Sequence, residues 1–550
     1  MATPTPTETA TATLDTADAL DAAAVNPRRW LVLAVMCLSL LLIVMDNTIV
    51  NVALPTIRTD LGATTSQLQW IVDAYILVFA GLLLTMGSLG DRFGRRGALA
   101  AGLGVMAVAS ILSSLATSPD QLIAARAVMG VGGALVMPAT LSIITNVFTV
   151  PRERAQAIAI WSATAGMAVA IGPVTGGWLL EHWWWGSVFL VNVPVVVVAV
   201  VAGQLVVPTS RDPEAPPVDI PGALLSIAGL TSLVYAIIEG PDGWTAPDVV
   251  GGFIAAAVLL GAFALWERRT AFPMLDISLF RNPRFSAASG AIALTFFAMF
   301  GAFFLFTQLL QSVMGYTPLQ AGIRLLPMAA TQLVVAPASA KLVERIGSKV
   351  VVAAGMLIAA VGMLLTSQVT TGVSYPELAF CLVVLSAGFA MMMPSATEAI
   401  MGSVPPAKAG VGSAVNDTTR ELGGAFGVAV LGSVVSSTYG SQMRDAVAGS
   451  PLPAAAADAV SDQIGAAVEV ARQIGGEPGR LLADAASTAF VDGMSTALMI
   501  GAAVLAVGAA LVVRFLPARA HDDRPPGAVE DERDNLTERA TGRELQPVGR

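Results

Sequence analysis

The sequence GSLGDRFGRR, from Gly87 to Arg96, has a counterpart in AKLVERIGSK, from Ala340 to Lys349. The two segments share a hydrophobic residue, an acid, an arginine, a glycine and a final base at the same spacing. Each lies between the second and third apolar segments of a set of six. The repeat therefore predicts two related six-helix bundles, with a substrate site between them near the middle of a membrane.

Apolar segments long enough to cross the roughly 30 Å of bilayer hydrocarbon occur along most of the chain. They predict fourteen transmembrane helices, in the order six, two, six. Their limits are 30–51, 70–90, 97–116, 121–146, 157–180, 186–207, 220–240, 249–266, 286–310, 320–340, 349–368, 377–401, 411–437 and 489–515. A soluble protein does not explain this series, because it would need a core larger than single domains form.

The composition also indicates a membrane protein. Of the 550 residues, 55% are hydrophobic and 13% are charged, compared with about 25% charged in soluble domains. We therefore expect an all-α membrane protein. In chain order, the expected parts are a disordered cytoplasmic tail at 1–29, an N-terminal six-helix bundle at 30–207, a cytoplasmic linker at 208–219, an additional helix pair at 220–267, a C-terminal six-helix bundle at 286–515 with a long extracytoplasmic loop at 438–488, and a disordered cytoplasmic tail at 516–550. The run AAAADAVSDQIGAAVEVARQI in that loop predicts an outer amphipathic helix.

Lysine and arginine in the short loops predict the orientation, because cytoplasmic loops carry an excess of these residues. With the N-terminus inside, the short outer loops hold only Arg58. The cytoplasmic loops then hold Arg92, Arg95, Arg96, Arg152, Arg154, Arg211, Arg268, Arg269, Arg281, Arg284, Lys341, Arg345, Lys349 and Lys408. Both termini are expected in the cytoplasm, and no cleavable signal pattern precedes the first helix. The Ala, Gly, Val and Arg bias indicates a bacterial host, so we expect the bacterial inner membrane.

Four motifs carry a family resemblance. They are MDNTIVNVALP (Met45–Pro55) in the first helix, GSLGDRFGRR (Gly87–Arg96), RAVMGVGGA (Arg126–Ala134) in the fourth helix and GMAVAIGPVTGG (Gly166–Gly177) in the fifth. Together they resemble the major facilitator superfamily, specifically its fourteen-helix drug:proton antiporter branch, the QacA/EmrB-like multidrug exporters. The resemblance covers about residues 30–515 and implies the major facilitator fold.

Asp46 is the first candidate for proton coupling and substrate binding. A charged residue inside an apolar helix costs about 2.5–3.5 kcal/mol on insertion scales, and is a functional-site hypothesis by default. Arg126 lies about 8 Å, and Asp46 roughly 6 to 8 Å, from the outer ends of their predicted helices. The matching depths predict a pair in which Arg126 is displaced when a proton or substrate arrives. The alternatives are that Asp46 pairs with an Asn or backbone group, and that Arg126 only holds helices together.

Three further acids are candidates at helix ends. Asp73 lies one turn inside the predicted second helix, where binding of a proton or cation and plain solvation both stay open. Glu239 and Glu398 lie close to the ends of their predicted helices. We interpret both as interfacial residues.

The loop motif predicts a conformational latch, a role that the resemblance implies. Asp91 is placed to pair with an arginine or to cap the N-terminus of a neighbouring helix. Arg95 and Arg96 are expected to bind lipid headgroups or acidic partners, although the positive-inside rule alone also explains these bases. The residues of the predicted latch are Gly87, Asp91, Arg92, Gly94, Arg95 and Arg96.

The fifth helix holds the antiporter motif that the resemblance implies, formed by Gly172, Pro173, Gly176 and Gly177. Glycine and proline allow a kink and close helix contact, which would suit sealing or bending between access states. The alternative is the ordinary enrichment of both residues in membrane helices.

A stripe of aromatic residues on the ninth helix would suit a platform for flat cationic drugs, and a packing or lipid-facing stripe is the alternative. It consists of Phe296, Phe300, Phe303 and Phe304, with Gln308 and Gln311 on nearly the same face. Near the start of the thirteenth helix, Asn416, Arg420 and Glu421 are candidates for part of an inner gate. A solvated helix end is the alternative there.

No Walker loop, HExxH motif or Cys/His cluster with ligand spacing occurs, so ATP hydrolysis and metal chemistry have no visible machinery. We expect no cofactor and no metal, with a proton gradient as the energy source. The expected function is an alternating-access antiporter, not an enzyme, that exports drug-like, antibiotic or toxic amphipathic molecules, including cations. Its expected partners are the small-molecule substrate, protons and membrane lipids, without nucleic acid or an obligate protein partner. An exporter of one specific metabolite or antibiotic and a non-transporting membrane sensor or scaffold stay open as alternatives.

Overall fold

The computed structural model describes residues 27–63, 65–210, 219–240, 243–273, 275–405, 408–448, 450 and 452–517. Within these residues the regular structure is helical, and fourteen helices are long and apolar enough to cross a membrane. The predicted number and the order six, two, six are confirmed. The expected tails lie almost wholly outside the described residues, as does most of the expected linker at 208–219.

The first bundle contains six spans, of which the sixth is formed by a short helix and a longer one. Its elements are α2 (Arg29–Leu61), α3 (Thr65–Phe93), α4 (Arg95–Ser114), α5 (Pro119–Val147), α6 (Pro151–His182), α7 (Ser187–Leu190) and α8 (Asn192–Val206). The additional pair is α9 (Ile220–Glu239) and α10 (Pro247–Glu267).

The second bundle begins after the short 3-10 helix η2 (Ile277–Arg281). Its first span ends in the π-helical segment η3 (Leu309–Val313). Its helices are α11 (Pro283–Gln308), α12 (Pro318–Arg324), α13 (Leu326–Ile346), α14 (Ser348–Thr366), α15 (Tyr375–Met401), α16 (Ala409–Val447), α17 (Ala454–Asp462), α18 (Ile464–Ile474) and α19 (Gly476–Phe515).

Local sequence signals explain several helix starts. Proline occupies the first helical position of α5, α6, α10 and α11, where its missing N–H removes no helical hydrogen bond. Before α5, the Ser118 side chain accepts a hydrogen bond from the backbone N–H of Gln121. Thr317 and Gln320 form a capping box at the start of α12. These signals set where the spans begin, and apolar burial then holds them together.

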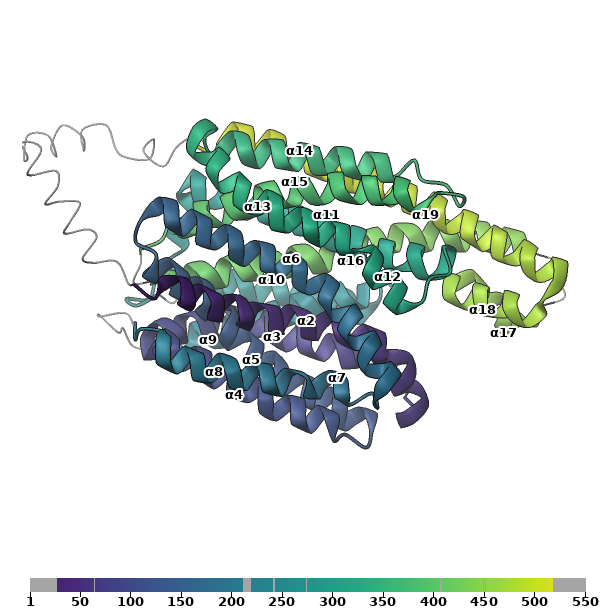
Figure 1. The fold of residues 1–550 in the computed structure, drawn as a ribbon, viewed down its shortest axis with the longest axis horizontal. Helices are drawn as coiled ribbons and strands as arrows, with labels where there is room; N and C mark the ends of the chain where they lie inside the picture. The colour runs from purple at the N-terminus through teal and green to yellow at the C-terminus, as the bar shows by residue number, and fades with distance from the viewer. Residues whose placement is uncertain are drawn as a thin grey trace, which may run out of the picture.

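Each bundle has its own hydrophobic core. Figure 1 shows α2, α4, α5 and α8 on one side of the molecule and α13, α14, α15 and α19 on the other, with the helices nearly parallel. The additional pair packs against α3, because Gly81 of α3 lies directly beside Thr231 of α9. The pair also contacts the second bundle, since the Trp244 indole N–H donates to Ser433 Oγ of α16 at 3.1 Å. The additional helices therefore touch both bundles.

The expected loop at 438–488 is the largest correction to the predicted boundaries. Residues up to Val447 continue α16, residues from Gly476 belong to α19, and α17 and α18 lie between them. These elements project together at one end of the molecule (Figure 1). The predicted amphipathic helix forms two helices that are separated at Gln463, which has an extended backbone. Hydropathy misplaced these boundaries because a helix continues beyond the apolar segment once tertiary contacts bury one of its faces.

Candidate proton and substrate site

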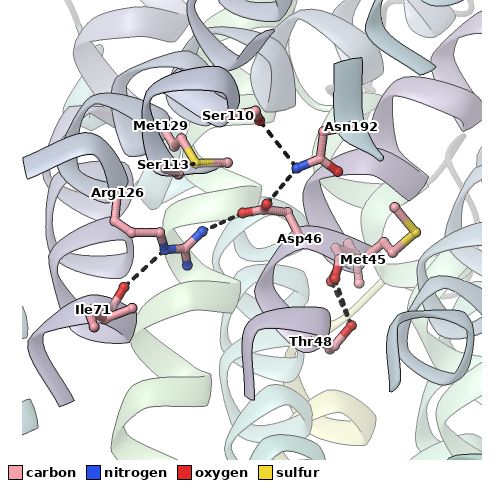
Figure 2. A network of polar contacts seen from close by, with 10 residues as sticks. Met45, Asp46, Thr48, Ile71, Ser110, Ser113, Arg126, Met129 and Asn192 are labelled. Carbon is pink, nitrogen blue, oxygen red and sulfur yellow. Dashed lines mark hydrogen bonds and ion pairs between the residues drawn. The ribbon is translucent and has the colours of Figure 1, made fainter. Parts of the chain in front are cut away.

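Asp46 lies fully buried inside the first bundle and is held by two polar partners. Its Oδ2 accepts a hydrogen bond from Arg126 Nη1 at 2.5 Å, and its Oδ1 accepts one from Asn192 Nδ2 at 2.7 Å. All three side chains have 0% exposure. Figure 2 shows the carboxylate between the two donors, which come from α5 and α8. Both oxygens accept, so this is the arrangement of a charged carboxylate.

Arg126 has three kinds of contact. Besides its ion pair with Asp46, its Nε donates to the backbone carbonyl of Ile71 on α3 at 2.9 Å. Its guanidinium carbon lies 4.6 Å from the centre of the Tyr75 ring, a cation–π contact. Tyr75 stacks on Phe79 and lies within electrostatic range of Glu421 on α16. The arginine thus joins three helices.

The predicted contact between Asp46 and Arg126 is present, and the alternative Asn contact is present beside it. The first helix was predicted to end at 51, whereas α2 continues to Leu61. Asp46 is therefore deeper in its helix than predicted. Asn192 was missed by the sequence reasoning, because a single uncharged polar residue in an apolar segment gives little signal.

Asp73 is not part of this network. It lies two turns inside α3, which begins at Thr65 rather than near residue 70, and its side chain is half-buried. Its electrostatic neighbour is Glu239, the last residue of α9 in the additional pair. Among the described residues, no hydrogen bond or ion pair joins Asp73 to Asp46 or Arg126.

The latch motif lies where the two bundles meet. Asp91 Oδ1 accepts hydrogen bonds from Arg95 and from the backbone N–H of Gly410, and Oδ2 accepts one from the backbone N–H of Val411. The expectation that Arg95 binds lipid headgroups is wrong, because its side chain is buried and paired with Asp91. Its acidic partner belongs to the same motif.

The other latch residues lie around this contact. Gly87 packs so closely on α16 that a methyl group there would lie 2.6 Å from both the Ala414 methyl and the Gly410 carbonyl oxygen. Gly94 separates α3 from α4 with φ 111°, a backbone conformation that favours glycine. Arg92 lies over the Phe93 ring, and Arg96 donates to the carbonyl of Val207 at 3.3 Å.

Two ion pairs join the bundles near the same end. Arg154 at the start of α6 pairs with Glu398 on α15 at 2.8 Å, and both side chains are about four-fifths buried. Glu398, expected at the interface with water, instead has a partner in the other bundle. Arg152 pairs with Glu344 on α13 at 2.9 Å in a more exposed contact.

A second buried polar cluster lies on α16 and faces the first bundle. Asn416 and Arg420 are 0% and 3% exposed, so the alternative of a solvated helix end is wrong for them. Arg420 lies 4.8 Å from the Trp161 ring of α6 and 5.2 Å from the Phe296 ring of α11. Asp417, which the sequence reasoning missed, is also buried and accepts a hydrogen bond from Asn416.

The four phenylalanines of the predicted platform have different surroundings. Phe296 is buried, with its ring 5.4 Å from that of Phe300, and Phe300 packs against Gly424 of α16. Phe303 is half-buried against the core of the second bundle. Phe304 is 41% exposed. Only the first part of the stripe therefore reaches the Arg420 cluster.

The antiporter motif places glycines at close helix contacts. Gly172 and Gly176 face Thr48 and Ile49 of α2, and side chains at these two positions would overlap them. Gly177 faces Leu319 of α12, and Pro173 packs on Gly322 of the same helix. The motif thus joins α6 to its own bundle and to the other bundle, at the end opposite Asp91.

A family profile described as Major Facilitator Superfamily matches residues 36–428. The chain belongs to the major facilitator superfamily. Within the residues that the structure describes, no group of three or more His, Cys, Asp or Glu side chains is placed to hold a metal ion. Among the relatives of this superfamily member is the multidrug efflux pump LfrA of Mycolicibacterium smegmatis, 38% identical over 88% of this chain and 96% of its own length.

Two further relatives are named as resistance proteins. The tetracenomycin C resistance and export protein of Streptomyces glaucescens is 33% identical over 92% of this chain and 95% of its own. The methyl viologen resistance protein SmvA of Salmonella typhimurium is 32% identical over 86% of this chain and 95% of its own. With fourteen apolar helices and such relatives, this superfamily member is a multi-pass protein of the bacterial inner membrane and a transporter of small molecules rather than an enzyme.

Solved structures of other transporters have a similar fold. The human organic anion transporter MFSD10 (TETRAN) gives a TM-score of 0.56 at 16% identity, covering 87% of this chain and 100% of that one. A bacterial homologue of the human lysosomal transporter Spinster, in an inward-facing and unoccupied conformation, gives 0.55 at 19% identity, covering 90% and 100%. At these identities the likeness shows the fold alone.

Proposed function

We propose that this transporter is a proton-coupled antiporter that exports drug-like, antibiotic or toxic amphipathic molecules, including cations. The observation that carries the proposal is the fully buried ion pair between Asp46 and Arg126. Two charges inside a membrane bundle are costly to retain, which favours a functional role over a structural one. The names of the relatives, which include multidrug efflux, tetracenomycin C resistance and methyl viologen resistance, support the substrate class.

In the coupling step, a proton competes with Arg126 for the carboxylate of Asp46. While the carboxylate is charged, it holds Arg126 and thereby fastens α2 to α5 and α3. A proton that enters from outside neutralises Asp46 and weakens this attraction, because the ion pair is then lost. The freed arginine changes the packing of α3, whose other end carries the latch residue Asp91.

The direction of transport depends on which end faces the cytoplasm. We propose that the Asp91 end is cytoplasmic, as the loop arginines predict. The contacts of Asp91 with α16 and of Arg154 with Glu398 then close the inner side. Opening them gives the substrate access from the cytoplasm, and closing them commits it to release outside. A proton gradient, without a cofactor, supplies the energy.

The test is efflux of dyes and drugs from a pump-deficient bacterium, with and without a protonophore, at matched membrane expression. The native chain and the variants Asp46→Asn and Asp484→Asn are compared, since Asp484 is an exposed acid outside the site. We expect efflux that the protonophore abolishes, that Asp484→Asn retains and that Asp46→Asn lacks. Protonophore-sensitive efflux that Asp46→Asn leaves unchanged would overturn the assignment of Asp46.

A further inference from the structure

Asn192 makes contacts that pure packing does not require. It is the first residue of α8 and has 0% exposure. Its Nδ2 donates to Asp46 Oδ1 at 2.7 Å and to Ser110 Oγ of α4 at 3.3 Å. Its Oδ1 is buried without a hydrogen-bond partner among the described residues. A buried unpaired carbonyl oxygen is unfavourable by about 1–3 kcal/mol and calls for an explanation.

The explanation follows from the other protonation state of Asp46. A neutral carboxyl group must donate one O–H, and when the proton arrives Oδ2 still faces Arg126, which has only donors. The proton therefore resides on Oδ1, which faces Asn192. In the present arrangement it would meet the Nδ2 group, so that two donors oppose each other.

Rotation of the Asn192 amide by half a turn removes this conflict. The rotation exchanges Nδ2 for the unpaired Oδ1, which then accepts the hydrogen bond from the neutral Asp46. An asparagine can do this because it carries a donor and an acceptor at equivalent positions. The rotation also reverses the hydrogen bond with Ser110, whose hydroxyl accepts from Nδ2 in the present arrangement and can donate to Oδ1 afterwards.

Among the described residues, Arg126 and Asn192 are the side chains that hydrogen-bond to Asp46. Arg126 reaches it from α5, and Tyr75 lies nearby on α3, within range of Glu421 of α16. Helices α7 and α8 contain no titratable side chain, and α6 carries its charged residues only near its ends. The unpaired oxygen of Asn192 is thus the acceptor that the geometry supplies.

We propose that Asn192 is a positioning residue that responds to the protonation of Asp46, donating to the carboxylate and, after rotation of its amide, accepting from the neutral carboxyl group. This inference rests on the proposed function, because it needs Asp46 to exchange a proton. Because Ser110 lies on α4, reversal of its hydrogen bond carries the state of Asp46 from α8 to α4.

The experiment is pH-difference infrared spectroscopy on the full-length protein in liposomes, with asparagine carrying ¹³C in its side-chain carbonyl. In the native chain we expect a carboxyl band that titrates together with a shift of a labelled amide band. Asn192→Leu should abolish the amide shift and move the carboxyl band to higher frequency, as for a carboxyl group without an acceptor. Asn282→Ser, which replaces another labelled asparagine that caps α11, should keep both signals.

The Asp46→Asn variant distinguishes a failure of the proposed function from a failure of the inference about Asn192. If no titrating carboxyl band disappears in Asp46→Asn, the proposed function fails. If such a band exists but its frequency and the labelled amide band do not depend on Asn192, the present inference is wrong while the proposed function stands. Asn192→Ala, which removes the amide without adding bulk, is the second variant in case Asn192→Leu is unstable, because the labelled chain holds other asparagines and the shift must be assigned to Asn192.

Transport gives a second readout. A hydrogen bond stabilises a charged carboxylate more than a neutral carboxyl group. Asn192→Leu should therefore destabilise the charged form of Asp46 more than its neutral form. We expect the pH profile of drug–proton exchange to move to higher pH by on the order of one unit. A lower rate with an unchanged pH profile would indicate a merely structural residue and would contradict the proposal.

Discussion

The Asp91 carboxylate of α3 accepts a hydrogen bond from the backbone N–H of Gly410, the second residue of α16, at 3.0 Å. The residue that precedes α16, Lys408, provides no side-chain cap of its own. Asp91 therefore acts as the cap, and its charge faces the positive end of the helix dipole. The cap belongs to one bundle and the helix to the other, so a separation of the bundles at this end would break the contact.

Asp91→Asn should shift the conformational equilibrium toward opening at this end. A cap is worth about 1 kcal/mol, which corresponds to a roughly fivefold change in population. Spin labels at Gly97→Cys and Arg345→Cys, in a background in which Cys37 and Cys381 are replaced by serine, report the distance between the bundles. We expect a longer, broader distance distribution in the variant. Identical distributions with and without the carboxylate would show that the cap has no part in closure.

Gly87→Ala should also prevent closure, for a steric reason. The added methyl would lie 2.6 Å from the Ala414 methyl and from the Gly410 carbonyl oxygen, a separation that requires the helices to move apart. Gly90→Ala is the matched control, because its methyl would meet only the Ala98 methyl at 3.6 Å. Drug efflux should fall by about tenfold or more in the first variant and stay near native in the second. Equal efflux in Gly87→Ala and Gly90→Ala would contradict the close contact between Gly87 and α16.

The ion pair between Arg154 and Glu398 is expected to couple the bundles energetically. Single replacements by alanine should each lower the melting temperature and the efflux, whereas the double replacement should cost less than the sum of the two. Because the pair is about four-fifths buried, we expect a coupling energy of about 1 kcal/mol. A thermal-unfolding double-mutant cycle measures this energy. If the effects of the two single replacements add up to that of the double replacement, the ion pair contributes no coupling energy.

The aromatic stripe should divide into a functional part and a lipid-facing part. Phe296 contacts Arg420 and is buried, while Phe304 is 41% exposed. Phe296→Ala should change the relative efflux of cationic and neutral drugs, since it removes a ring that attracts cations. Phe304→Ala should leave this ratio unchanged. The ratios of minimal inhibitory concentrations measure the effect, and the reverse result would move the substrate surface toward Phe304.

Arg126→Lys should abolish most transport even though it keeps the charge. Lysine lacks the planar fork that lets Arg126 bond Asp46 and the Ile71 carbonyl at once. We expect proton-coupled uptake of drug into inside-out vesicles to fall by more than about tenfold. Binding of drug to detergent-solubilised protein provides the control for folding. Native uptake in this variant would show that charge alone is sufficient.

The candidate site was partly predictable from the sequence. Charged residues are rare in membrane helices, so Asp46 and Arg126 were conspicuous, and similar depths predicted their contact. Asn192 and Asp417 were not singled out, because neither lies in a motif with a known role. The partners of Asn192 come from distant segments, whereas Asp417 has partners on its own helix. For Arg95 the sequence left lipid headgroups and an acidic partner open, and only the tertiary structure shows its side chain buried against Asp91.

The sequence by itself determined the number of spans and their division into six, two and six, because crossing lipid demands long apolar segments whatever the helices contact. It also determined the repeat that relates the bundles. Only the tertiary structure decided that Asn192 meets Asp46, that Asp91 caps α16, and that α16 and α19 extend into the expected loop. Such contacts join residues far apart in the chain, and no local pattern specifies which faces of the helices meet.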